Sequence, residues 1–128
     1  MSADREFELT AELQEEFDAA GQNGHVGQQL LSETDKVRVW SIRLKPGERV
    51  GFHAHVLDYF WTAVTAGTSR SHVNGGPPKT TTYKPGETRQ FAYGAGERMI
   101  HDLENIGDTE LVFVTVEFLH SANLPLRL

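Results

Sequence analysis

Apolar and polar residues alternate in short stretches from residue 37 onward, and a period of two is typical of half-buried β-strands. The alternating or β-branched stretches are residues 37–44, 58–66, 69–74, 80–84, 89–93 and 111–118. Turn residues such as the GGPP segment separate them. About seven or eight short strands with frequent turns are typical of a sandwich or a closed barrel. We therefore predict an all-β fold.

The segment TAELQEEFDAA, which precedes these strands, has a different pattern. Leu13 and Phe17 lie one helical turn apart, and Thr10 is placed to cap the first turn. Gly21 follows at a position where a left-handed helix end is favoured. The spacing predicts a short N-terminal helix, although the apolar residues around Leu9 also alternate as they would in a strand.

Two copies of Lys-Pro-Gly-Glu, at residues 45–48 and 84–87, each follow one predicted strand and precede another. Proline fixes φ at the first central position of a turn, and glycine tolerates positive φ at the next, so each copy predicts a type II turn. Two such corners, about 40 residues apart, fit the two Greek-key halves of an antiparallel jelly-roll β-barrel. Two unrelated turns explain the repetition equally well.

The length of 128 residues suits one domain, and the 38% hydrophobic and 23% charged content is ordinary for a globular protein. We expect a helix and linker over 1–36 that pack on a barrel over 37–118, followed by a tail over 119–128. No apolar run approaches the roughly 18 residues of a spanning helix, and the N-terminus lacks the layout of a signal peptide. We therefore predict a cytoplasmic protein without a membrane partner.

Charge and cysteine content exclude several classes of site. The formal net charge is −6 and no block of Lys or Arg is present, so we expect no nucleic-acid partner. A DNA-binding regulator is further disfavoured because no segment has the pattern of a helix-turn-helix. The chain has no cysteine, which removes disulfides, thiolate nucleophiles and cysteine-based zinc sites.

Candidate chemistry centres on the histidines of the segment GERVGFHAHVLDYFW. His53 and His55 are two residues apart, so on a strand both imidazoles point to the same face, as two ligands of one ion must. Most isolated pairs of this kind have structural or surface roles. Here aromatic and β-branched residues follow, so we expect this face to be interior, where an unpaired imidazole costs about 1–3 kcal/mol. His101, in another β-like segment, is a third candidate ligand.

Three histidines from two strands would leave coordination positions open, as in catalytic metal sites. Imidazole ligands favour one divalent Fe, Zn, Ni, Mn or Cu ion over Mg or Ca. Three neutral histidines would not offset the positive charge of the ion. We therefore expect a small-molecule ligand that is anionic or chelating.

Gly47, five residues, His53-Ala-His55 and Gly67 resemble the first motif of the cupins, G-x5-H-x-H-x3 or 4-E-x6-G. His101 and Asn105 are similar to the H-x3-N end of the second motif. The resemblance covers about residues 37–118 and implies a small single-domain cupin of the conserved-barrel type. It also implies an antiparallel jelly-roll barrel with the metal inside, the pocket at one mouth, and pairing into a homodimer.

The sequence departs from the cupin motifs in two places. The glutamate position falls on Tyr59 or on Phe60, depending on the count, and the match of Gly67 favours Phe60. The interval from Gly86 to His101 is four residues longer than in the second motif, and Gly-Glu-Arg replaces its P-x-G. The geometry of the 93–101 loop is therefore left open by the resemblance.

Asp58 is an alternative source of the missing carboxylate ligand, because on an extended strand it shares the parity of Phe60. A turn after His55 that brings Asp58 inward would complete such a site. Three histidines alone remain the leading ligand set.

Other residues have both a functional and a structural interpretation. Tyr59, Phe60 and Trp61 are consecutive, so at least one must face the interior and shape an apolar pocket. His72 is a candidate proton donor or base facing that cavity, and Arg98 a candidate substrate ligand at its mouth. Core packing for the aromatic residues and solvent exposure for His72 and Arg98 are the competing interpretations.

Two functions fit this pattern. The first is a mononuclear metal-dependent enzyme, either similar to the non-haem iron dioxygenases or a metal-assisted lyase or isomerase. The second is a non-catalytic cupin that binds a small ligand or has an accessory role, with a structural metal or none. Catalytic residues beyond the ligands, the substrate and the metal identity are not readable from the sequence.

Overall fold

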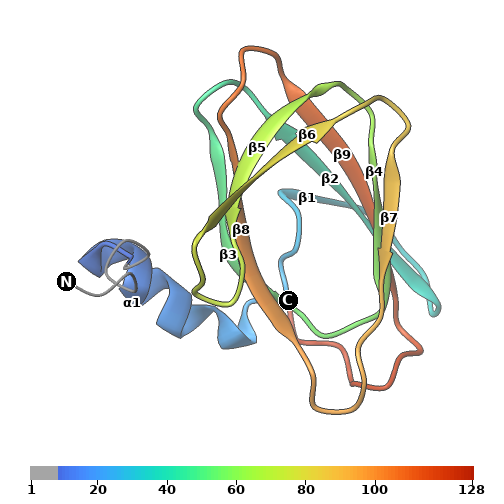
Figure 1. The fold of residues 1–128 in the computed structure, drawn as a ribbon. Helices are drawn as coiled ribbons and strands as arrows, with labels where there is room; N and C mark the ends of the chain where they lie inside the picture. Colours follow the sequence, from blue (N-terminus) through green and yellow to red (C-terminus); the bar gives the residue numbers. More distant parts are fainter. Residues whose placement is uncertain (1–8) are drawn as a thin grey trace.

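The computed structural model describes residues 9–128, which fold into two facing antiparallel sheets with a helix beside them (Figure 1). The helical elements are α1 (Ala11–Ala19) and the 3-10 turn η2 (Ala20–Gln22). The strands are β1 (Gln29–Glu33), β2 (Val37–Leu44), β3 (Arg49–His55), β4 (Tyr59–Ala63), β5 (Gly67–His72), β6 (Pro78–Tyr83), β7 (Thr88–Phe91), β8 (Met99–Asn105) and β9 (Leu111–Phe118).

The strand order is that of a jelly roll. One sheet has the order β1-β2-β9-β4-β7 and the other β3-β8-β5-β6, so the successive strands β2 to β5 alternate between the two sheets. All pairings are antiparallel. The prediction of an all-β antiparallel jelly roll with a short N-terminal helix is confirmed. One boundary needs correction: residues 29–33, expected in the linker, form β1 and extend the first sheet beyond β2.

The two Lys-Pro-Gly-Glu segments form the same turn at equivalent corners of the barrel, between β2 and β3 and between β6 and β7. Gly47 and Gly86 both have φ of +87°, the region that favours glycine. In each turn the backbone N–H of the glutamate donates to the lysine carbonyl at 3.0 Å. The side chain of the same glutamate accepts a hydrogen bond from the lysine N–H.

Apolar side chains form two clusters on opposite faces of the β3-β8-β5-β6 sheet. The first lies between the sheets and contains Ile42, Leu44, Ala63, Tyr83, Leu111 and Phe113. The second lies on the outer face, where Phe52, Ala54 and Ile100 pack against α1 and η2. The helix begins as predicted, because the Thr10 side chain accepts a hydrogen bond from the N–H of Leu13 at 3.2 Å.

Because α1 covers the outer face, β3 is buried on both sides. Phe52 and Ala54 point outward toward the helix, while His53 and His55 point inward between the sheets. In the other sheet, β1 is an edge strand among the described residues and exposes Leu30 and Leu31. The homodimer stays a prediction.

Within residues 9–128, no helix is long and apolar enough to cross a membrane.

Candidate metal centre

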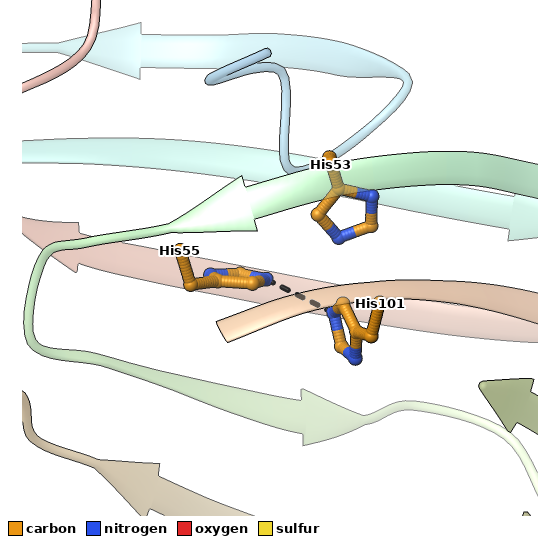
Figure 2. A group of neighbouring side chains, drawn as sticks. All are labelled: His53, His55 and His101. Atoms are coloured by element: carbon orange, nitrogen blue, oxygen red, sulfur yellow. Dashed lines mark hydrogen bonds between the residues drawn. The ribbon is translucent and has the colours of Figure 1, made fainter. Parts of the chain in front are cut away.

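Three histidines meet on the inner face of the β3-β8-β5-β6 sheet (Figure 2). His53 and His55 lie on β3, and His101 lies directly opposite His53 in the antiparallel register of β3 and β8. Their candidate ligand nitrogens all lie within 4.8 Å of one another, and His53 and His55 are each only 2% exposed. The pairing of two strands thus brings together residues that are 46 positions apart in the sequence.

The spacing of the nitrogens suits a shared cation. Nε2 of His55 lies 3.1 Å from Nε2 of His101. Two nitrogens that are each about 2.1 Å from one ion lie about 3.0 Å apart at a right angle and about 3.4 Å apart in a tetrahedron. Nε2 of His55 has no other hydrogen-bond partner among the described residues than Nε2 of His101. These residues therefore fit a transition-metal ion, since imidazole is a ligand that such ions accept.

The tautomer of His53 is set by the backbone. Its Nδ1 lies 2.8 Å from the carbonyl oxygen of Gly51, which can only accept, so Nδ1 carries the proton and donates it. The lone pair is then on Nε2, the atom free to bind an ion. Hydrogen bonds of this kind fix the ring orientation of metal-binding histidines.

The same peptide unit is held from the opposite side by helix α1. A bulge between Val50 and His53 leaves the N–H of Phe52 free of the ladder, and it donates to Oε2 of Glu16 at 2.8 Å. The Gly51 C=O and the Phe52 N–H belong to one trans peptide group and point in opposite directions. His53 and Glu16 therefore form hydrogen bonds at opposite edges of the same peptide group. A side chain on Gly51 would place its Cβ 3.3 Å from the Glu16 carboxylate, so glycine suits this close approach.

Glu16 is itself fixed by a bidentate ion pair with Arg49, at 3.0 and 2.6 Å. These hydrogen bonds, which Arg49 donates and Glu16 accepts, lower the pKa of Glu16 and raise the pKa of Arg49. Arg49 also donates to the buried Asp102 at 3.0 Å. The network ties the helix to both histidine-bearing strands from the outer face.

We expect Glu16→Ala to lower the free energy of unfolding by about 1–3 kcal/mol, because it leaves the Phe52 N–H and the Arg49 guanidinium without their acceptor. Urea unfolding measures this loss, and amide exchange at Phe52 localises it. Glu15→Ala is the matched control, because Glu15 is an exposed glutamate on the same helix. Equal losses in the two variants would show that Glu16 acts only through helix propensity or net charge.

Burial keeps the three imidazoles neutral. It lowers the pKa of His53 to about 4, with partial opposition from its hydrogen bond to Gly51. Burial also lowers the pKa values of His55 and His101 well below the ordinary value, and the neighbouring histidines add to the effect. Neutral imidazoles are the form that binds a metal, so no proton has to be displaced near neutral pH.

A cavity of about 250 Å³ lies beside the histidines between the two sheets. Tyr59 stacks on the ring of His55 with centroids 3.9 Å apart, and Phe91 stacks on the other face of Tyr59 at 4.7 Å. Trp61, one pleat further along β4, lines the same cavity. The Tyr59 hydroxyl is buried without a hydrogen-bond partner among residues 9–128, and burial raises its pKa. The Tyr59 hydroxyl therefore stays protonated, and the Tyr93 hydroxyl adds to the rise of its pKa.

Phe60 lies elsewhere than expected. It points away from the cavity and packs against Phe118 on the outer face, with ring centroids 6.1 Å apart. Tyr59 instead occupies the inward position after His55. The motif count with three residues between His55 and the glutamate position is therefore the correct one, and the four-residue count that Gly67 favoured is wrong. The reason is strand parity, because Tyr59 and Trp61 must share a face that Phe60 cannot reach.

Asp58, His72 and Arg98 also lie outside the cavity lining. The Asp58 carboxylate accepts the backbone N–H of Tyr93 at 3.0 Å and is absent from the candidate ligand group of the described chain. His72 faces the outer side of β5, where its ring and its N–H contact Asp102. Arg98 is exposed and its Nη1 reaches the carbonyl of Gly21 at 3.5 Å. We therefore correct two predictions: His72 and Arg98 do not line the pocket, and Asp58 does not join the ligand group.

The sequence analysis missed several cavity residues. Lys79 and Thr81 on β6 and Arg89 on β7 line the cavity. Alternation along β6 predicts that residues 79 and 81 share a face, but not that this face is inside. Glu117, which does not line this cavity, was also missed. It is 3% exposed and accepts a hydrogen bond from Trp40 Nε1 at 2.7 Å, and burial raises its pKa to about 6.

Solved structures support this fold assignment. A cupin domain from Bordetella pertussis Tohama I is 28% identical, with a TM-score of 0.62, and the match covers 70% of this chain and 88% of that one. A cupin family protein with a double-stranded β-helix fold from Methanocaldococcus jannaschii is 20% identical, with a TM-score of 0.57 over 70% and 76% of the two chains.

A protein with a double-stranded β-helix domain from Klebsiella pneumoniae is 20% identical, with a TM-score of 0.56. That match covers 96% of this chain and 92% of the other, so it includes the N-terminal region as well as the barrel. No protein-family model matches the sequence, and no curated protein does.

Proposed function

We propose that this cupin-type single domain binds one divalent transition-metal ion through His53, His55 and His101 and acts on a small molecule in the adjoining cavity. The observation that carries this proposal is the 3.1 Å approach of two Nε2 atoms inside a group of three buried or half-buried imidazoles. Fe, Zn, Ni, Mn and Cu are all compatible with such ligands.

The proposed reaction class is that of a non-haem iron dioxygenase, or of a metal-assisted lyase or isomerase. A bound ion would supply Lewis-acid polarisation of a substrate oxygen. The cavity supports a small substrate, because 250 Å³ is just below the usual range of about 300–1,000 Å³ for ligand pockets.

The residues of the chain would bind and orient this substrate. Tyr59 and Trp61 form an apolar wall that limits water near the histidines. The Tyr59 ring, which stacks on His55, would hold that imidazole in place beside the substrate. Gly51 holds the Nδ1 proton of His53, so Nε2 faces the site with its lone pair.

Metal analysis of protein purified without chelator tests the proposal. We expect about one equivalent of a transition metal per chain, either as isolated or after reconstitution with Fe(II), Zn(II), Ni(II), Mn(II) or Cu(II). Less than about a tenth of an equivalent with every ion would contradict it. The non-catalytic alternative predicts bound metal or bound ligand without turnover, and His53→Ala would then change the melting temperature but abolish no activity.

A further inference from the structure

The charge of the cavity wall differs from that of the whole protein. The chain has a formal net charge of −6, yet two cationic side chains, Lys79 and Arg89, line the cavity. No Asp or Glu of the described residues lines it. A concave site lined by one sign of charge attracts ligands of the opposite sign.

Lys79 and Arg89 face the cavity from opposite sheets. Lys79 lies on β6, opposite Ser71, and Arg89 lies on β7, opposite Trp61. Both strands are free edges of their sheets, and the two residues are exposed, whereas His53 and His55 are buried. The cations therefore lie at the solvent side of the cavity, and the histidines lie deeper in the barrel.

The strand register gives the approximate depth between them. β6 is separated from the strand of His101 by β5, so two strand spacings, or about 10 Å, lie between the two strands. The intervening strand β5 contributes Ser71, opposite Lys79, and the next residue of the chain that lines the cavity is Val73, opposite His101. The rest of the lining is largely apolar or aromatic and includes Tyr83, Leu103 and Phe113. A ligand that spans the cavity would thus have an apolar body.

Both cations are available to a ligand. Within residues 9–128, Lys79 makes no ion pair, and Arg89 forms one only with Glu87, at 3.5 Å, with 59% of its side chain exposed. Exposed pairs of this kind contribute about 0–1 kcal/mol, so little is lost when Arg89 turns to another anion. The guanidinium fork can bind a carboxylate through two parallel hydrogen bonds.

We infer that Lys79 and Arg89 form an anion-binding rim, and that the cavity takes a small carboxylate with an apolar body, whose anionic group lies at this rim. The opposite end of the ligand would approach the histidines, and only this second contact rests on the proposed metal site.

Benzoate and benzamide are suitable probes, since they have nearly the same shape and differ in charge. Calorimetric titration of the metal-free full chain, in chelator and low salt, should give binding of benzoate about tenfold tighter than that of benzamide. The Lys79→Gln/Arg89→Gln double variant should lose this preference. Arg43→Gln/Lys84→Gln is the matched control, because it removes the same charge from exposed residues outside the cavity and should keep the preference.

The inference is overturned if the double variant keeps the preference, if the control loses it equally, or if the unchanged protein does not prefer benzoate. Circular dichroism of each variant verifies the fold. Because the titration uses metal-free protein, failure of metal binding leaves its result valid. Conversely, if the protein binds metal but its preference for benzoate does not depend on Lys79 and Arg89, the anion-binding rim is contradicted and the proposed metal centre is not.

Discussion

His101→Ala is expected to reduce bound metal from about one equivalent to below a tenth of an equivalent and to abolish any metal-dependent turnover. Loss of a residue that merely supports a ligand already weakens metal binding about 10–100-fold, and His101 supplies one of only three ligand atoms. The remaining pair, His53 and His55, lies on β3 alone, so no candidate ligand from β8 would be left. Metal analysis after reconstitution and dialysis measures the effect.

The control for this prediction is His120→Ala, because His120 is exposed and its ring contacts only the carbonyl of Asp35 among the described residues. It should retain the metal. His101→Gln serves as a second variant that preserves volume and a hydrogen-bonding group beside His55, in case the alanine variant is unstable. A folded His101→Gln protein that still binds a full equivalent would show that His101 is not a ligand.

The second large effect is the acid sensitivity of the metal-free protein. Burial lowers the pKa of His53 to about 4 in the folded state, while the unfolded chain has the ordinary value of about 6.5. Between these two values the unfolded chain binds a proton that the folded protein does not. The stability is thus full above about pH 6.5 and is lost as the pH falls toward 4, by about 3 kcal/mol for His53. His55 and His101 shift in the same direction and increase the loss.

Glu117 acts in the opposite direction over part of this range. Burial raises its pKa to about 6, so the folded state binds its proton more readily and gains stability as the pH falls. Urea unfolding of the metal-free Glu117→Gln variant between about pH 7.5 and 4.5 therefore isolates the histidine contribution. Adding His53→Gln should reduce the slope of the free energy of unfolding against pH by about 1.4 kcal/mol per pH unit. If the free energy of unfolding of the Glu117→Gln protein does not change with pH, the three imidazoles are solvated and the prediction is wrong.

The amino-acid pattern predicted features that depend on neighbouring residues in the chain. Alternation identified β2 and β9 with their observed bounds, and the Pro-Gly pairs predicted two turns with φ of +87° at the glycines. The cap by Thr10 was equally readable. Each of these follows from the conformational preferences of a few adjacent residues, so no distant contact is needed.

Strand β1 was not predicted, because its residues are exposed and lack a buried face to impose alternation. Its existence depends on pairing with β2, which is a tertiary contact. The role of Phe60 was misjudged for a related reason. Counting along a motif cannot decide which of two adjacent aromatic residues faces inward, because a shift of one position reverses every side chain of the strand.

By itself, the sequence determined that His53 and His55 share a face, since side-chain direction alternates along any strand. Only the tertiary structure decided that this face is interior, that His101 joins it through the register of β3 and β8, and that Lys79 and Arg89, from different sheets, line the same cavity. The physical reason is that strand pairing and the packing of α1 on the outer face fix which side of each strand is inside, and these contacts join residues far apart in the chain.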